Sequence, residues 1–163
     1  MSIADRERYL VAMKKALLAL LMLAGAVAFF LYEERDSGSG AASAIEREVE
    51  RGPGHVFALA DHTDFEWDRV YLFGPYSQRE DVEARLGVRW QAGFDSHIES
   101  SDAIVLVVFS HEGRVVEHFD LPRATADLTP CVGAGNAAIT RAAARFVVGN
   151  DGVVSLDDTA PGD

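Results

Sequence analysis

Residues 103–110 read AIVLVVFS, residues 111–113 read HEG, and residues 115–121 read VVEHFDL. The first run is almost wholly apolar, as expected of a central strand that is covered on both faces. The short run after it predicts a turn. The third run alternates, with Val115, Phe119 and Leu121 on one face, as in a half-buried return strand. Together the three runs predict an antiparallel hairpin at the centre of a sheet.

A second strand and a helix are predicted upstream of this hairpin. Residues 69–73 (RVYLF) are rich in β-branched and aromatic residues and end at a Gly-Pro pair. Residues 77–80 (SQRE) match the S-x-x-E capping box, which predicts the start of a helix. Val82 and Leu86 then share one face of that helix, and Gly87 follows as the residue expected at its end.

The remaining strands are short and joined by turns. A last hairpin is predicted from residues 145–149 to residues 153–156, around residues 150–152 (NDG), a strong turn signal. Strands that follow one another in this way form a largely antiparallel sheet, and one main helix covers one of its faces. The predicted fold class of residues 55–156 is therefore α+β.

The longest apolar segment lies near the N-terminus. Residues 16–32 (ALLALLMLAGAVAFFLY) are 17 consecutive positions without a charge, about 25 Å long as a helix. Lys14 and Lys15 precede the segment and acidic residues follow it, so the positive-inside rule places the N-terminus in the cytoplasm. We predict a single-pass transmembrane signal-anchor helix in a bacterial cytoplasmic membrane, with residues 1–15 as a cytoplasmic leader. A cleaved signal peptide is the alternative reading.

Residues 33–54 are predicted to connect this anchor to an extracytoplasmic domain. Within them, residues 36–44 (DSGSGAASA) have the composition of a flexible tether. Residues 45–51 (IEREVER) fit a short amphipathic helix or an edge strand equally well. The folded domain is then expected over residues 55–156, with a disordered tail over residues 157–163.

Charge and composition exclude several classes of partner. The chain has 163 residues and a net charge of −11, and its acidic excess lies after the apolar segment, so nucleic acid and anionic lipid are unsuitable partners for the folded part. The single cysteine, Cys131, excludes an intramolecular disulfide and a zinc site of several thiolates. Residues 61–64 (DHTD) lack the glycine and the terminal glutamate of a calcium loop and are read as a solvated loop. No cofactor or metal is predicted.

The stretch Trp67–Tyr76 has the pattern W-D-x-V-Y-x-F-x-P-Y and is followed by the capped helix, by residues 98–102 (IESSD) and by residues 120–123 (DLPR). This arrangement resembles a group of small bacterial envelope proteins that are membrane-anchored or lipoprotein-like, over roughly residues 63–152. The resemblance implies export and a single domain, with no assigned activity and no catalytic residues. Ala26 stands where a lipoprotein would carry its lipid-bearing cysteine.

Aromatic residues give the best candidate for a binding site. Four of them are expected on one side of a strand as core, namely Phe65, Trp67, Tyr71 and Phe73. Tyr76 stands just past Pro75 at the start of the helix, where an exposed ring anchors a partner. Asp120 and Arg123 are its expected polar companions at another strand end. We predict a non-catalytic binding or interaction module for a protein or cell-envelope component.

Two alternatives come from other classes of function. An envelope hydrolase requires a histidine and a carboxylate that converge on Cys131 or on a serine such as Ser96, Ser100 or Ser101. Cys131 by itself is more simply a buried apolar filler. A structural or sensor domain would instead use His118 and the acidic surface to respond to pH or cations.

Overall fold

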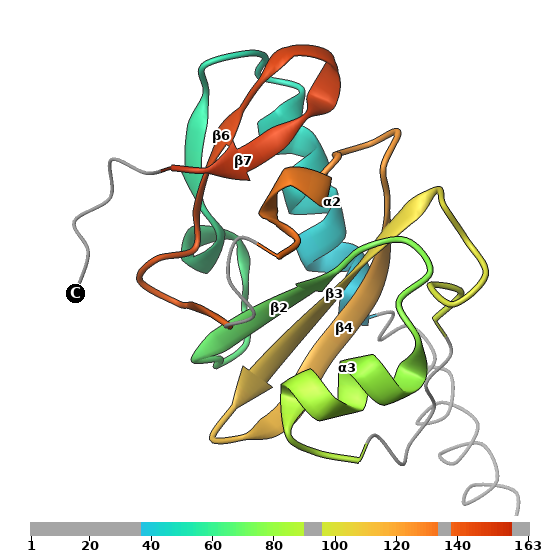
Figure 1. The fold of residues 1–163 in the computed structure, drawn as a ribbon. Helices are drawn as coiled ribbons and strands as arrows, with labels where there is room; N and C mark the ends of the chain where they lie inside the picture. The colour runs from blue at the N-terminus through green and yellow to red at the C-terminus, as the bar shows by residue number, and fades with distance from the viewer. Residues whose placement is uncertain (1–36, 90–95, 134–137, 158–163) are drawn as a thin grey trace, which may run out of the picture. The chain divides into compact units, whose positions relative to one another are not determined.

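The structure of this chain is a computed structural model that describes residues 37–89, 96–133 and 138–157 (Figure 1). The predicted cytoplasmic leader (1–15) and membrane helix (16–32) lie outside these residues, as do residues 158–163 of the predicted tail. Within the described ranges, no helix is long and apolar enough to cross a membrane. The described residues belong to one compact unit, Ser37–Asp163.

The described elements comprise two α-helices, seven strands and three short 3-10 helices. In chain order they are α2 (Ser37–Val49), β1 (Val56–Ala58), η1 (Leu59–His62), β2 (Arg69–Phe73), α3 (Arg79–Leu86), β3 (Ile104–His111), β4 (Arg114–Pro122), η2 (Thr129–Cys131), β5 (Ile139–Thr140), β6 (Arg145–Val148), η3 (Asn150–Gly152) and β7 (Val154–Leu156). The strands form a four-stranded sheet, in the order β4-β3-β2-β5, and a three-stranded sheet, in the order β1-β6-β7. Both sheets are antiparallel, which confirms the α+β class, whereas the expectation of a single sheet was wrong.

The predicted central hairpin is confirmed. β3 lies between β2 and β4, and its residues from Val105 to Ser110 are all buried, as the apolar run predicts. The last hairpin is also present as β6 and β7, which pair around η3. Local alternation and turn residues were therefore sufficient to locate the two hairpins, β3 with β4 and β6 with β7.

Each face of the four-stranded sheet carries its own core. On one face, Val82 and Leu86 of α3 pack with Tyr71 and Phe73 of β2. On the other face, Ile45 of α2 and the inner residues of the three-stranded sheet belong to the larger core. Figure 1 shows α3 and α2 at different places around the sheet. The prediction of one main covering helix was therefore wrong, because α2 also covers the sheet.

The tether prediction was wrong as well. Residues Ser37–Val49 form the helix α2, in which Ala41, Ala44 and Ile45 are buried. Glycine and serine lower helix propensity, so the sequence of this segment favours a flexible chain. Burial against the larger core decides the outcome, since tertiary packing supplies most of the stability of a short helix.

Two groups of residues that were predicted to share one face are divided between the two cores in the structure. In the first group, the chain bends before β2. Phe65 and Trp67 precede β2 and pack around Phe109 in the larger core, whereas Tyr71 and Phe73 lie on the opposite face. All four remain at least half-buried, so the core assignment is confirmed and only the shared face was wrong.

The predicted face of the return strand is also divided. A β-bulge lies between Phe109 and Ser110 in the pairing of β3 with β4. Val115 consequently packs in the smaller core, while Phe119 and Leu121 pack in the larger one. An extra residue on one strand shifts the side-chain alternation by one position, and the three residues no longer share a face.

The ends of two other segments differ slightly from expectation. α3 begins at Arg79 after Gln78, and Ser77 donates its hydroxyl to Gly74 O instead of capping the helix. Gly87 ends α3 in the left-handed conformation, as predicted. Asp157, expected in the disordered tail, is held to Arg145 through its backbone N–H and an ion pair.

Candidate functional site

The three residues singled out by the sequence, Tyr76, Asp120 and Arg123, all contact residues 96–103, the loop that leads into β3. The backbone N–H of Tyr76 donates to Ile98 O at 2.9 Å. Asp120 accepts from Ser96 and His97, and Arg123 donates to the carbonyl oxygens of Asp102 and Ala103. The fold thus brings their anchoring contacts together along one loop.

Tyr76 occupies a tight turn in an unusual conformation. Ser77 N–H donates to Gly74 O at 3.3 Å, which closes the turn Gly74–Ser77 with Pro75 at its second position. The φ angle of Tyr76 is 63°, and a positive φ is what the third position of a type II turn requires and what glycine ordinarily supplies. For a residue with a Cβ atom, the left-handed region costs roughly 1–2 kcal/mol.

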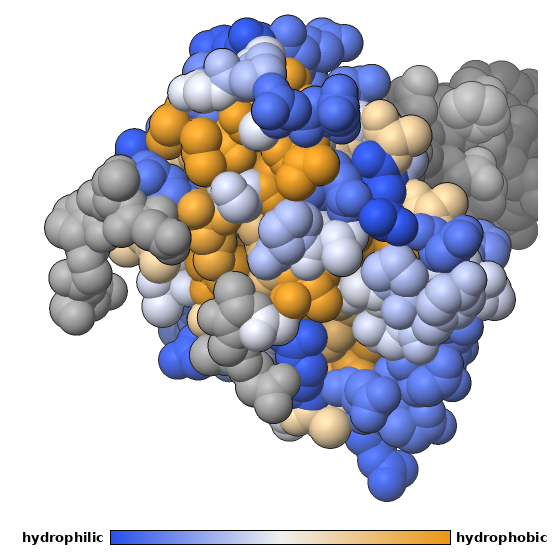
Figure 2. Space-filling view, turned by 45° about the horizontal axis from the view of Figure 1, so that its top comes forward, coloured by the Kyte–Doolittle hydropathy of each residue, from blue (hydrophilic) through white to orange (hydrophobic). Residues whose placement is uncertain are grey.

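The Tyr76 side chain points outward from this turn. It is 56% exposed, and it is the most exposed of the large apolar or aromatic residues in the described part of the chain. The others are Val56, Val116 and Val153. Figure 2 shows that apolar side chains gather on part of one face of the molecule, bordered by hydrophilic ones. Single exposed valines are ordinary at a protein surface, whereas an exposed ring on a strained turn is not.

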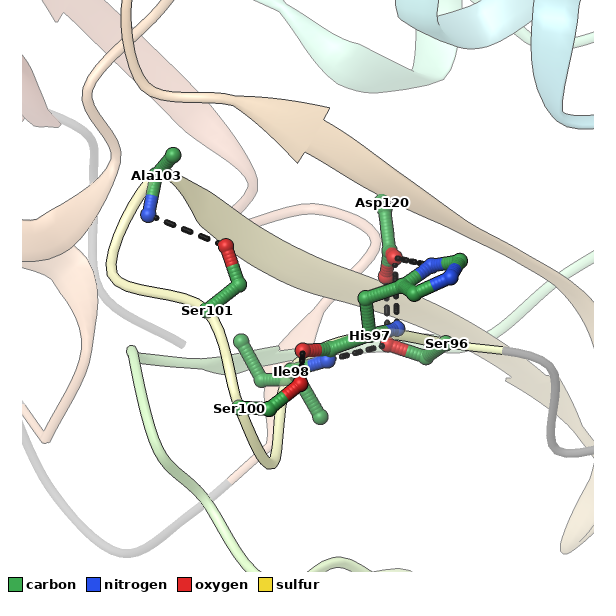
Figure 3. Close-up of polar contacts among 7 residues, drawn as sticks. All are labelled: Ser96, His97, Ile98, Ser100, Ser101, Ala103 and Asp120. Carbon is green, nitrogen blue, oxygen red and sulfur yellow. Dashed lines mark hydrogen bonds and ion pairs between the residues drawn. The ribbon is translucent and has the colours of Figure 1, made fainter.

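Asp120 holds residues 96–98 in place (Figure 3). Ser96 Oγ donates to Asp120 Oδ1 at 2.5 Å, and His97 N–H donates to Asp120 Oδ2 at 2.9 Å. Ser96 Oγ in turn accepts the N–H of Ile98 at 3.1 Å. This pattern fixes the start of the loop on β4 and leaves Ile98 fully buried in the smaller core.

Ser96, His97 and Asp120 do not have the arrangement of a hydrolase site. The carboxylate of Asp120 lies between the Ser96 hydroxyl and the His97 ring, whose Nδ1 is 3.7 Å from Asp120 Oδ2. A nucleophilic serine needs the imidazole next to its hydroxyl to accept the proton. The His97 side chain is also 83% exposed, so water surrounds it. This geometry gives Ser96 a hydrogen bond to a carboxylate and does not place the His97 imidazole next to its hydroxyl.

Arg123 is engaged in a bidentate ion pair with Asp127. Arg123 Nη2 and Nε donate to the two carboxylate oxygens of Asp127, at 2.8 and 3.1 Å. Asp127 also accepts from the N–H and the hydroxyl of Thr129. The hydrogen bonds from Arg123 are the largest cause that lowers the pKa of Asp127 to about 2. Arg123 therefore fastens the end of β4 to η2.

Cys131 is buried in the larger core, and burial raises the pKa of its thiol to about 12. A thiol in that state stays protonated at neutral pH and is a poor nucleophile. The half-buried His118 lies on β4, where its N–H donates to Glu117 Oε1.

Sequence reasoning missed a buried cluster of ionisable groups around Glu48, at the C-terminal end of α2. The Glu48 side chain is only 6% exposed. Its carboxylate lies 2.5 Å from His55 Nε2, 3.6 Å from His62 Nε2 and 3.3 Å from Arg51 Nη2. We call these four residues the Glu48 cluster. His62 was expected in a solvated loop with Asp61 and Asp64, but in the structure it approaches Glu48 instead.

The hydrogen bond with His55 is the main cause that lowers the pKa of Glu48, and Arg51 and His62 act in the same direction against the effect of burial. Glu48 therefore stays ionised although it is buried. Within the described residues, no group of three or more histidine, cysteine, aspartate or glutamate side chains has a geometry that would hold a metal ion. The sequence offers little signal for the cluster, since residues 52–54 (GPG) interrupt the helix and remove the meaning of the helical spacing between Glu48 and the two histidines.

Comparison with models of known protein families, with curated proteins and with solved structures finds no match for this chain.

Proposed function

We propose that this chain is a non-catalytic binding module that presents its α+β domain on the outer side of a bacterial cytoplasmic membrane, anchored through residues 16–32. Tyr76 is the anchor for a protein or cell-envelope component. The observation that carries the proposal is the exposed ring of Tyr76 on a hydrogen-bonded turn, at a φ of 63° that is unfavourable for an aromatic residue.

The stability of the folded domain does not explain why position 76 is a tyrosine. The ring is 56% exposed and therefore contributes little packing, while the backbone conformation favours glycine or asparagine. Positions that are strained in the free protein concentrate at functional sites. An aromatic side chain on a fixed backbone also loses little conformational entropy when it binds, which suits an interface anchor.

The arrangement of the other candidate residues supports a binding role over a hydrolytic one. Ser96 bonds to a carboxylate and not to an imidazole, and the thiol of Cys131 is held in its protonated form. Asp120 and Arg123 use their polar groups to position residues 96–103 beside the turn. We assign them to the support of the Tyr76 surface.

The test replaces Tyr76 by asparagine, which tolerates the left-handed conformation. We expect Tyr76→Asn to keep the free energy of unfolding or raise it by up to about 1 kcal/mol, because the strain is relieved. Capture of the partner from detergent-solubilised membranes, with the full chain as bait, is expected to fall at least about tenfold. Urea denaturation and quantitative mass spectrometry measure the two effects.

The control is Val116→Ser, which removes an exposed apolar side chain from β4. It should leave capture unchanged. A Tyr76→Asn variant that unfolds would identify the ring as part of the core, and one that captures the same proteins as the unchanged chain would end the proposal.

A further inference from the structure

The Glu48 cluster lies where α2 joins the rest of the domain. Glu48 belongs to the last turn of α2, Arg51 follows the helix, His55 precedes β1 and His62 ends η1. The two histidines also flank Phe57 of the larger core, with ring centroids 6.4 and 6.1 Å away. One carboxylate thus bonds to two segments that are not part of its own helix.

α2 has little stability of its own. It has 13 residues, and its first half reads SGSGAAS. Isolated helices of this length are marginal in water even when they are rich in alanine, and each glycine costs about 1 kcal/mol more. The apolar anchors are also small, since two of the three fully buried residues are Ala41 and Ala44. The attachment of α2 therefore depends strongly on the contacts at Glu48.

The ionised carboxylate of Glu48 is the negative group that Arg51, His55 and His62 approach. Arg51, His55 and His62 are the groups whose hydrogen bonds and charges act on it. α2 packs against η1 and the strand β4. The acidic residues of β4 have partners elsewhere: Glu117 accepts from His118 N–H, and Asp120 accepts from Ser96 and His97. Histidine side chains are in general cations at a pH that protonates a carboxyl group. Protonating Glu48 would therefore remove the negative charge that Arg51, His55 and His62 approach.

We propose that the Glu48 cluster is an acid-sensitive latch, and that protonation of Glu48 releases α2 from the domain while the four-stranded sheet stays folded. The released segment is the first described element after residue 36. Its 13 residues span about 20 Å as a helix and about 45 Å when extended. Release would lengthen the connection to residues 1–36 and expose the face of β4 that α2 covers.

The direction of the pH effect follows from Glu48. Its pKa in the folded protein is lowered from the ordinary value of 4.5. The stability that it contributes is therefore fully present above about pH 4.5 and is lost as the pH falls through the pKa of the folded protein. Release is expected in acid and not in base.

Hydrogen exchange on the full chain tests the latch through Glu48→Gln, which keeps the shape of the side chain and removes its charge. At pH 7 we expect the amides of residues 44–49 to lose protection by at least about tenfold, while those of β3 stay within about twofold. Glu46→Gln, an exposed neighbour on the same helix, is the matched control and should change neither.

Two outcomes would overturn the proposal: unchanged protection of α2 in Glu48→Gln, or an equal loss in α2 and β3, which would show that the domain unfolds as a whole. If Glu48→Gln does not fold, the unchanged chain is compared at pH 6 and pH 3.5 after correction for intrinsic exchange. Selective loss of protection in α2 at the lower pH supports the latch, and equal protection at both pH values overturns it.

Discussion

Three non-glycine residues in the described part of the chain have positive φ angles: Tyr76, Glu112 and Asp151. Glu112 lies beside Gly113 in the turn between β3 and β4, and Asp151 lies in the turn between β6 and β7. Two-residue hairpin turns favour this conformation because it matches the twist of the strands. Tyr76 precedes a helix, so no strand twist accounts for it. This difference between otherwise similar outliers is why we connect Tyr76, and not the other two, to function.

The pair Arg123 and Asp127 gives a prediction at the same scale. Asp127→Asn removes the charge that accepts both guanidinium hydrogen bonds, and we expect it to lower the free energy of unfolding by about 1 kcal/mol at pH 7, because solvent screens the partly exposed pair. Because the pKa of Asp127 is about 2 in the folded protein, its contribution is present above about pH 4 and is lost as the pH falls toward 2.

Urea denaturation at a series of pH values measures both effects. Asp64→Asn, at an exposed position, is the control and should have little effect. An Asp127→Asn variant with unchanged stability at pH 7 would show that the ion pair does not fasten β4 to η2.

At the scale of elements, the two helices differ in what holds them. α3 begins with Glu80 and Asp81 in its first turn and ends at a left-handed glycine, so its sequence specifies both ends. Arg79 N–H at its start also bonds to Glu99, from residues 96–103. α2 has no acidic residue in its first turn and carries glycines inside the helix. Its existence depends on burial, which explains why local pattern predicted α3 but, for α2, left a helix over residues 45–51 as one of two readings and missed the first half.

The same chemical change in the two helices is therefore predicted to have opposite effects. Gly40→Ala lies within α2 with open space around the position of a new Cβ atom, and it should raise the free energy of unfolding by about 0.5–1 kcal/mol. Gly87→Ala also meets open space, but the φ angle of Gly87 is 71°, so it should lower the free energy of unfolding by about 1 kcal/mol.

Thermal or urea unfolding of the two variants measures these changes. A Gly40→Ala variant without any gain would mean that residues 37–49 are not a helix in solution. A Gly87→Ala variant with an unchanged free energy of unfolding would show that α3 does not end in the left-handed conformation in solution.

At the scale of the whole molecule, the sequence predicted the antiparallel hairpins because alternation and turn residues act within a few positions. The division into two cores was not predicted, since it depends on the bend before β2 and on the bulge opposite Phe109. Of the candidate site, the exposure of Tyr76 was predicted from its place after Pro75. The Glu48 cluster was not, because residues 52–54 (GPG) end the helix before His55, so the spacing of 7 and 14 positions from Glu48 does not place the histidines on one helix face.

The location of the domain is most directly measured by labelling one introduced cysteine. Ser100→Cys lies on the exposed part of residues 96–103. The native Cys131 is buried and its thiol pKa is raised to about 12, so we expect no labelling of the unchanged chain, which is the control. A membrane-impermeant maleimide is added to intact bacterial spheroplasts that express the chain. If the domain lies outside the cytoplasm, as we propose, Ser100→Cys is labelled before lysis and the unchanged chain is not. Labelling of Ser100→Cys only after lysis would contradict export and, with it, the proposed function.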